Sequence, residues 1–158
     1  MKKYIGIAIA LCLLIGVSAF ALTRGENKLL SESNITEIPC DGVTLTVSAT
    51  HSEVEYTIES STVDYIVYDG YNDSMRLEML RDGKWYKVQA TGKSHDEPAA
   101  VSPNNSHTVR LKWKDVYKYN MESGQYRLVY TFWAMDKSKG HPPVESDSYV
   151  VIQEFVIQ

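Results

Sequence analysis

Residues 123–135 read SGQYRLVYTFWAM, and the order of their apolar and polar side chains decides the fold class. Every second residue is large and apolar, which is the period of a β-strand with one face in a protein core. The side chains on that face are Tyr126, Leu128, Tyr130 and Phe132. We expect each to be buried and to contribute about 1.5 to 3 kcal/mol from the apolar area removed from water. The opposite face carries Arg127, Val129, Thr131 and Trp133, and packing in this core does not explain these four residues.

The same period-two alternation recurs on both sides of this segment. It is seen in GVTLTVSA (42–49), EVEYTIES (53–60), TVDYIVYDG (62–70), DSMRLEML (73–80), HTVRLKW (107–113) and DSYVVIQEFVIQ (147–158). Strands that alternate between apolar and polar positions are typical of antiparallel sheets with one wet face. The sequence therefore predicts an all-β fold, an antiparallel β-sandwich of about 7–9 strands.

The links between these runs carry turn signals. Asp82-Gly83 separates two alternating runs, and because both residue types tolerate a positive φ angle it predicts a tight hairpin. Residues 89–106 (QATGKSHDEPAAVSPNNS) predict a long loop, and residues 114–124 (KDVYKYNMESG) predict a short turn or helical link.

Five of these segments, GVTLTV, EYTIESS, MRLEMLRDGKWYKV, SGQYRLVYTFW and YVVIQEFVI, together resemble a bacterial immunoglobulin-like domain family found in secreted and membrane-anchored proteins. The resemblance covers residues 42–158 and implies an Ig-like sandwich in which Tyr126 forms a tyrosine corner at the start of the penultimate strand. No cysteine pair can join the sheets, and the third strand has no tryptophan, so the likeness is to the broader sandwich class. It implies a surface or extracellular module and is nearly silent on activity.

The first 25 residues, MKKYIGIAIALCLLIGVSAFALTRG, have the order of an export signal. Lys2 and Lys3 precede an apolar run, and Ala19 and Ala21 flank Phe20 in an arrangement that a signal peptidase could cut. We expect a signal peptide over residues 1–21; the alternative is an uncleaved anchor, since the run is long enough to span a bilayer. Residues 22–41 are polar and suit a tether, so the expected domain covers 42–158, either secreted or anchored at the outer face of the cytoplasmic membrane.

Composition and motifs argue against several functions. Without residues 1–21 the chain has 14 Lys and Arg against 20 Asp and Glu, a formal net charge of −6, which disfavours nucleic acid as a partner. Cys40 would then be the remaining cysteine, so it is either a lone residue before the first strand or part of an intermolecular disulfide. The histidines have no metal-ligand spacing and lie in or beside predicted turns, at His51, His95, His107 and His141. The sequence predicts no catalytic residue, metal or cofactor, and no enzyme.

The outward face of the 123–135 strand is the predicted binding surface. If the last strand pairs with it, and the third strand lies alongside, their outward side chains form one apolar patch of the kind enriched in binding hot spots. The predicted residues are Trp133, Arg127, Val129, Val150, Ile152, Ile66 and Tyr68. We hypothesise that an unidentified protein partner, or a second copy, binds here. The alternative is that the tether, the long loop or a short extra strand covers the patch.

A second hypothesis comes from another class of function. A small secreted inhibitor or ligand-binding protein would use its loops instead of a sheet face, either residues 89–106 or the Gly140-His141-Pro142-Pro143 segment. In both hypotheses the membrane would be contacted only through the N-terminal segment, and only if that segment stays uncleaved.

Overall fold

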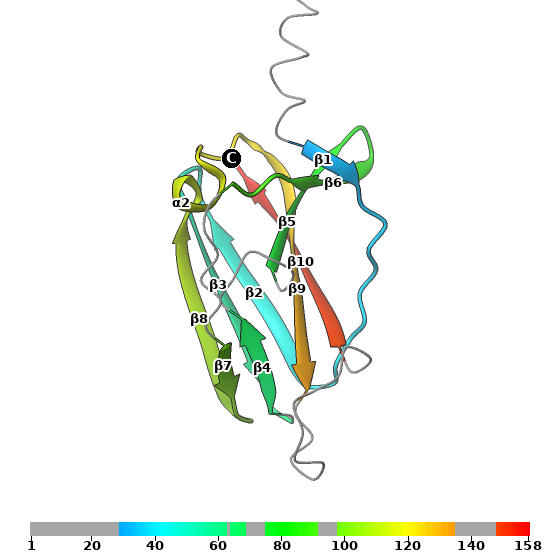
Figure 1. The fold of residues 1–158 in the computed structure, drawn as a ribbon, viewed down its shortest axis with the longest axis vertical. Helices are drawn as coiled ribbons and strands as arrows, with labels where there is room; N and C mark the ends of the chain where they lie inside the picture. The colour runs from blue at the N-terminus through cyan, green and yellow to red at the C-terminus, as the bar shows by residue number, and fades with distance from the viewer. Residues whose placement is uncertain (1–28, 63, 69–74, 92–97, 135–147) are drawn as a thin grey trace, which may run out of the picture.

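The computed structural model describes residues 29–62, 64–68, 75–91, 98–134 and 148–158. Within these residues the chain forms two antiparallel sheets packed face to face (Figure 1). Sheet A contains β1 (Leu29–Glu32), β4 (Tyr65–Tyr68), β5 (Met75–Arg81), β6 (Lys84–Val88), β7 (Pro98–Val101), β9 (Gly124–Ala134) and β10 (Ser148–Ile157). Sheet B contains β2 (Val43–Ala49), β3 (Glu53–Ser60) and β8 (Asn105–Lys112). The all-β sandwich is confirmed, with the four-residue strands β1 and β7 in segments that were expected to be irregular.

Strand β9 organises sheet A because it pairs along both of its edges. β10 pairs with it from Ser148 opposite Trp133 to Ile157 opposite Gly124. On the other edge, β5 pairs with residues 126–130 and β4 with residues 133–134. The inward side chains of the opening segment are at most 2 % exposed, as predicted. They face sheet B, and the ring of Tyr130 lies 5.6 Å from that of Tyr56.

The hairpin predicted at Asp82-Gly83 is confirmed. Arg81 pairs with Lys84 across a two-residue loop, and the loop residues have φ angles of 51° and 76°. Two consecutive positive φ angles are those of a type I′ turn, whose twist matches that of the flanking strands.

The link between β8 and β9 is the predicted helical turn, α2 (Trp113–Tyr117). Trp113 is fully buried, and its indole Nε1 donates a hydrogen bond to the Thr50 carbonyl at 2.8 Å. At the start of β9, the hydroxyl of Tyr126 donates to the carbonyl of Glu122 at 3.0 Å. This bond from a buried tyrosine to backbone just upstream is the tyrosine corner that the resemblance implied.

The folded part begins earlier than the expected boundary at residue 42. β1 pairs with β6, and residues 33–38, which we call the strap, run from β1 beside β10, on the side away from β9 (Figure 1). The Ser33 amide donates to the Trp85 carbonyl at 2.8 Å. At the other end Ile38 exchanges two backbone hydrogen bonds with Val150, at 2.9 and 3.0 Å. The segment 29–38, expected within a polar tether, is thus paired to the sheet at both of its ends. The expected signal peptide lies outside the described residues.

The segment 89–106, expected to be one long loop, contains a short strand and the start of another. Residues 98–101 form β7, which pairs with β4, and β8 already begins at Asn105. The proline and alanines of β7 have weak strand propensity, so its pairing is set by the free edge of β4 instead of by local preference. Residues 92–97 of this loop lie outside the described residues.

Candidate functional site

A buried charge cluster lies on the outer face of sheet A. Glu78 of β5 is directly opposite Arg127 of β9 in the ladder and is 0 % exposed. Arg127 donates a hydrogen bond from Nε to Glu78 Oε2 at 2.7 Å, and its Nη2 forms an ion pair with the same oxygen at 2.6 Å. Arg76 Nε lies 2.8 Å from the other oxygen, Oε1, as an ion pair without hydrogen-bond alignment. Burial of a carboxylate is tolerated here because two guanidinium groups compensate its charge.

Two neighbours cover Arg127 in this cluster, whereas the Arg76 side chain keeps 28 % of its surface exposed. The guanidinium carbon of Arg127 lies 4.6 Å from the ring centroid of Trp85, in the range of a cation–π contact. The Nη2 of Arg127 also donates to the carbonyl of Ile35, at 3.5 Å, in the middle of the strap. The strap and β6 therefore cover the outer face of the sheet around Arg127.

The cover changes the interpretation of the predicted binding residues. Arg127, Val129 and Val150 are buried, at 8 %, 2 % and 6 % exposure, so the expectation that they form an open patch is wrong. The physical reason is the strap, one of the covers that the alternative hypothesis allowed. Trp133 and Ile152 are half-buried and keep part of their surface in solvent.

The remaining predicted residues belong to β4. The predicted proximity of the third strand is confirmed, because Ile66 pairs with Trp133 in the ladder. The side chains of Ile66 and Tyr68 lie outside the described part of the structure. On the other side of Trp133 the ladder places Ser148, which is half-buried. We call the end of the outer face around Trp133 and Ser148, where these described side chains keep part of their surface in solvent, the uncovered end.

Glu78 and Trp85 are the important residues of this face that the sequence did not single out. Glu78 alternates with Leu77 and Met79, so it was assigned to a solvent-facing position. The sequence does contain one signal. Arg76 and Glu78 lie on the same face of their strand, so Glu78 could also pair with the arginine of β9. What the sequence could not supply is the register that brings Glu78 opposite Arg127.

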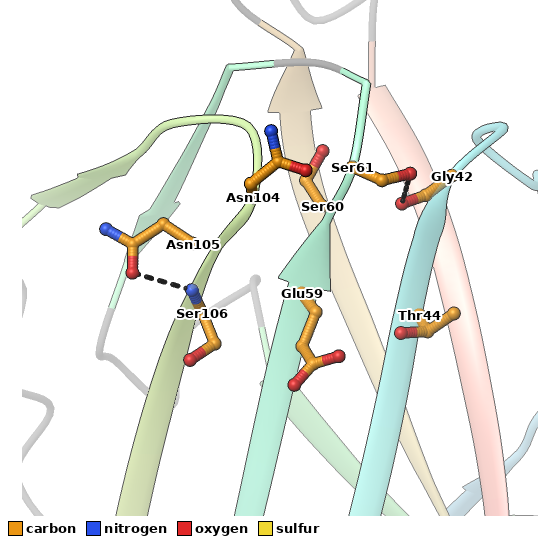
Figure 2. A pocket seen from close by; sticks show the side chains of 8 residues that line it. All are labelled: Gly42, Thr44, Glu59, Ser60, Ser61, Asn104, Asn105 and Ser106. Atoms are coloured by element: carbon orange, nitrogen blue, oxygen red, sulfur yellow. Dashed lines mark hydrogen bonds between the residues drawn. The ribbon is translucent and has the colours of Figure 1, made fainter.

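A second candidate is an open polar depression of about 560 Å³ at one end of sheet B. Figure 2 shows its lining, in which Thr44, Glu59 and Ser106 come from neighbouring strands of the sheet. Asn104 and Asn105, at the end of the predicted 89–106 loop, complete one side. The lining offers hydroxyl and amide groups and one carboxylate, and it includes no His, Lys, Arg or Cys. It can hydrogen-bond a polar ligand, and its lining contains neither a histidine nor a lysine of the kind that activates a serine nucleophile.

Other reactive groups are held in structural positions. Cys40 is buried in the core just before β2, and burial, followed by the charge of Asp41, raises the pKa of its thiol. A disulfide to another chain would require this thiol to leave the core. His51 Nδ1 lies 2.8 Å from the Met121 carbonyl at the α2 corner. His95 and His141 lie outside the described residues.

The described part of the chain contains neither a cluster of three potential metal-ligating side chains nor a helix long and apolar enough to cross a membrane.

Comparison with known proteins identifies the family of this domain. The family model described as the bacterial Ig-like domain matches residues 41–155, which includes both sheets apart from β1 and the last residues of β10. No curated protein matches the chain. The match agrees with the two antiparallel sheets and with the tyrosine corner. The chain therefore belongs to the bacterial Ig-like domain family.

Proposed function

We propose that this chain is a non-enzymatic, extracytoplasmic interaction module that binds a protein partner, or a second copy, at the uncovered end of the outer face of sheet A. Membership of the bacterial Ig-like domain family supports a non-catalytic module. The basic and apolar leader over residues 1–21 supports export, so that the domain is secreted or anchored at the outer face of the cytoplasmic membrane.

The proposed surface rests on the change in side-chain exposure along the outer face of β9. Arg127 and Val129 are covered, whereas Trp133, on the same face of the same strand, is only half-buried. A tryptophan that keeps exposed surface on a β-sheet is typical of the residues that dominate binding energy in interfaces. Ile152 is also half-buried, but Val150, which is buried and paired with Ile38, lies between it and the Trp133 end of the face.

The test compares Trp133→Glu with Thr46→Glu, a matched charge introduced at an exposed position on the outer face of sheet B. The protein, purified from a host that exports it, is examined by light scattering over a wide concentration range and then used to capture partners from the native cell envelope. The proposal predicts that Trp133→Glu abolishes dimerisation or capture and that Thr46→Glu leaves both intact. Folded Trp133→Glu protein that associates and captures as the wild type does would refute it.

A ligand-binding role for the depression on sheet B is the second candidate, because Asn104, Asn105 and Ser106 bring the end of the 89–106 segment to its rim. This candidate predicts the opposite result. Glu59→Gln combined with Asn105→Ala would remove binding of a polar ligand to the depression, and Trp133→Glu would leave that binding intact.

A further inference from the structure

The last strand, β10, has an open backbone edge. One edge pairs with β9, and at the other edge Val150 exchanges both of its backbone hydrogen bonds with Ile38. Successive residues of an antiparallel strand direct their amide and carbonyl groups to alternate edges. The backbone groups of Ile152, Glu154 and Val156 therefore point to the same edge as those of Val150. Among the described residues, the hydrogen bond that these backbone groups form at this edge is with Gln153, whose Nε2 donates to the Glu154 carbonyl at 2.8 Å.

From Val151 to Ile157 this edge lacks most of the features that usually prevent strand addition. Edge strands are commonly protected by proline, by charged side chains such as lysine, by a bulge or by a covering segment, and Glu154 is the charged side chain on this edge. From Val151 to Ile157 there is neither proline nor lysine, and the register with β9 continues without a shift. The strap runs beside β10 (Figure 1), and among the described residues its backbone pairs with this edge at Ile38. The rest of β10 is a template on which another strand could form main-chain hydrogen bonds.

The side chains along the edge define what an added strand must carry. In the described part of the chain, the exposed large apolar side chains are Ile38, at 49 %, and Val156, at 59 %, and both lie along this edge. Between them Glu154 is exposed and accepts a hydrogen bond from Gln125 Nε2 at 3.1 Å. Arg127 is opposite Glu154 in the ladder, but its guanidinium binds Glu78 instead. The edge thus presents an acidic group with apolar side chains two residues away on either side.

We infer that the open edge of β10 is a strand-addition site for an extended segment of another protein in which a lysine or arginine is flanked, two residues away on each side, by aliphatic residues. The basic residue would be opposite Glu154, and the aliphatic residues would be opposite Ile152 and Val156. Opposite charges across a strand pair are favourable, and apolar pairs on the same face add to them. This inference does not depend on the surface around Trp133.

A second copy of the chain fits this edge less well. In the two-fold antiparallel register that engages all three open residues, Glu154 would be opposite Glu154 of the other copy. Like charges directly opposite one another are destabilising. Charge complementarity therefore favours a basic partner strand over self-association.

The experiment uses the ¹⁵N-labelled protein and two capped peptides, Thr-Val-Thr-Lys-Thr-Val-Thr and the same sequence with a central glutamate. Each peptide reads the same in both directions, so either strand orientation brings the central residue opposite Glu154. Amide hydrogen exchange is followed at Ile152, Glu154 and Val156, with the amides of Val151, Gln153 and Phe155, which face β9, as internal controls. Glu154→Lys is the matched charge reversal, and Trp133→Glu shows whether the two surfaces are independent.

The inference predicts fast exchange of the three edge amides in the free protein and slower exchange with the lysine peptide. The lysine peptide should bind about three- to tenfold more tightly than the glutamate peptide, from the usual size of cross-strand charge effects. Glu154→Lys should reverse this preference, and Trp133→Glu should leave it unchanged. The inference is overturned if the edge amides are already protected, if the preference survives charge reversal, or if protection rises with protein concentration alone, which would identify self-association.

Discussion

Removing the carboxylate of Glu78 provides a quantitative test of the covered face. Glu78→Ala leaves Arg127 buried without its anionic partner, and the nearest remaining acceptor is the Ile35 carbonyl at 3.5 Å. Breaking a buried ion pair in this way costs about 3 to 5 kcal/mol, because the uncompensated charge stays desolvated. At a typical urea m-value of about 2 kcal/mol/M, the unfolding midpoint should fall by about 2 M.

The chain offers a matched control in the pair formed by Arg110 and Glu55. Its Nη2 to Oε2 distance is 2.6 Å, the same as that between Arg127 and Glu78, but its side chains are 67 % and 42 % exposed. Glu55→Ala should change stability very little, since solvent already screens that pair. The double variant Glu78→Leu with Arg127→Leu should be more stable than Glu78→Ala, because it removes the unpaired charge.

The assay is urea unfolding followed by circular dichroism, with the m-value checked in each variant. The reasoning is refuted if Glu78→Ala and Glu55→Ala lower the midpoint equally. Such a result would mean that solvent reaches Glu78 and that the strap does not close the face.

Three further predictions concern the corner, the thiol and the turns. Burial, with a smaller effect from the charge of Glu122, raises the pKa of Tyr126 to about 12. The contribution of Tyr126 to the free energy of unfolding should therefore be fully present below pH 10. It should be lost between pH 10 and 12, because the tyrosine of the unfolded chain ionises first. In pH-dependent unfolding experiments, Tyr126→Phe should lose about 1 kcal/mol at neutral pH with its hydrogen bond and show a shallower alkaline decline. The Cys40 thiol should react with a thiol reagent only as fast as the domain opens, so reaction at a rate like that of a free cysteine would contradict its burial. Gly83→Ala should cost about 1 kcal/mol from its positive φ alone, since nothing lies within 4 Å of the added Cβ. Gly42→Ala should cost more in the same unfolding assay, because its Cβ would lie 2.6 Å from two hydroxyl oxygens.

Local patterns in the sequence were sufficient for most of the fold. Period-two alternation identifies a strand and its buried face wherever one face is apolar, as in β9. The Asp82-Gly83 turn and the Tyr126 corner are also local signals, because each depends on a few adjacent residues. These features could be predicted since the chemistry that forms them is contained in the segment itself.

The cover of the outer face could not be predicted in the same way. The strap is mostly polar and has no alternation, so its position depends on backbone pairing with Trp85 and Val150, which are distant in the sequence. Arg127 was assigned to the edge of an open patch because a charged residue in a strand usually faces water. Its burial depends on Glu78, and only the ladder register brings the two together.

The proposed function depends on contact between a partner and the uncovered end of sheet A. The most direct measurement is site-specific photo-crosslinking in living cells that export the chain, with a photoreactive phenylalanine analogue in place of Trp133 and, separately, of Thr46. The account predicts a covalent adduct of defined mass from position 133 and none from position 46. Crosslinking at neither position, or equally at both, in folded and exported protein would contradict it.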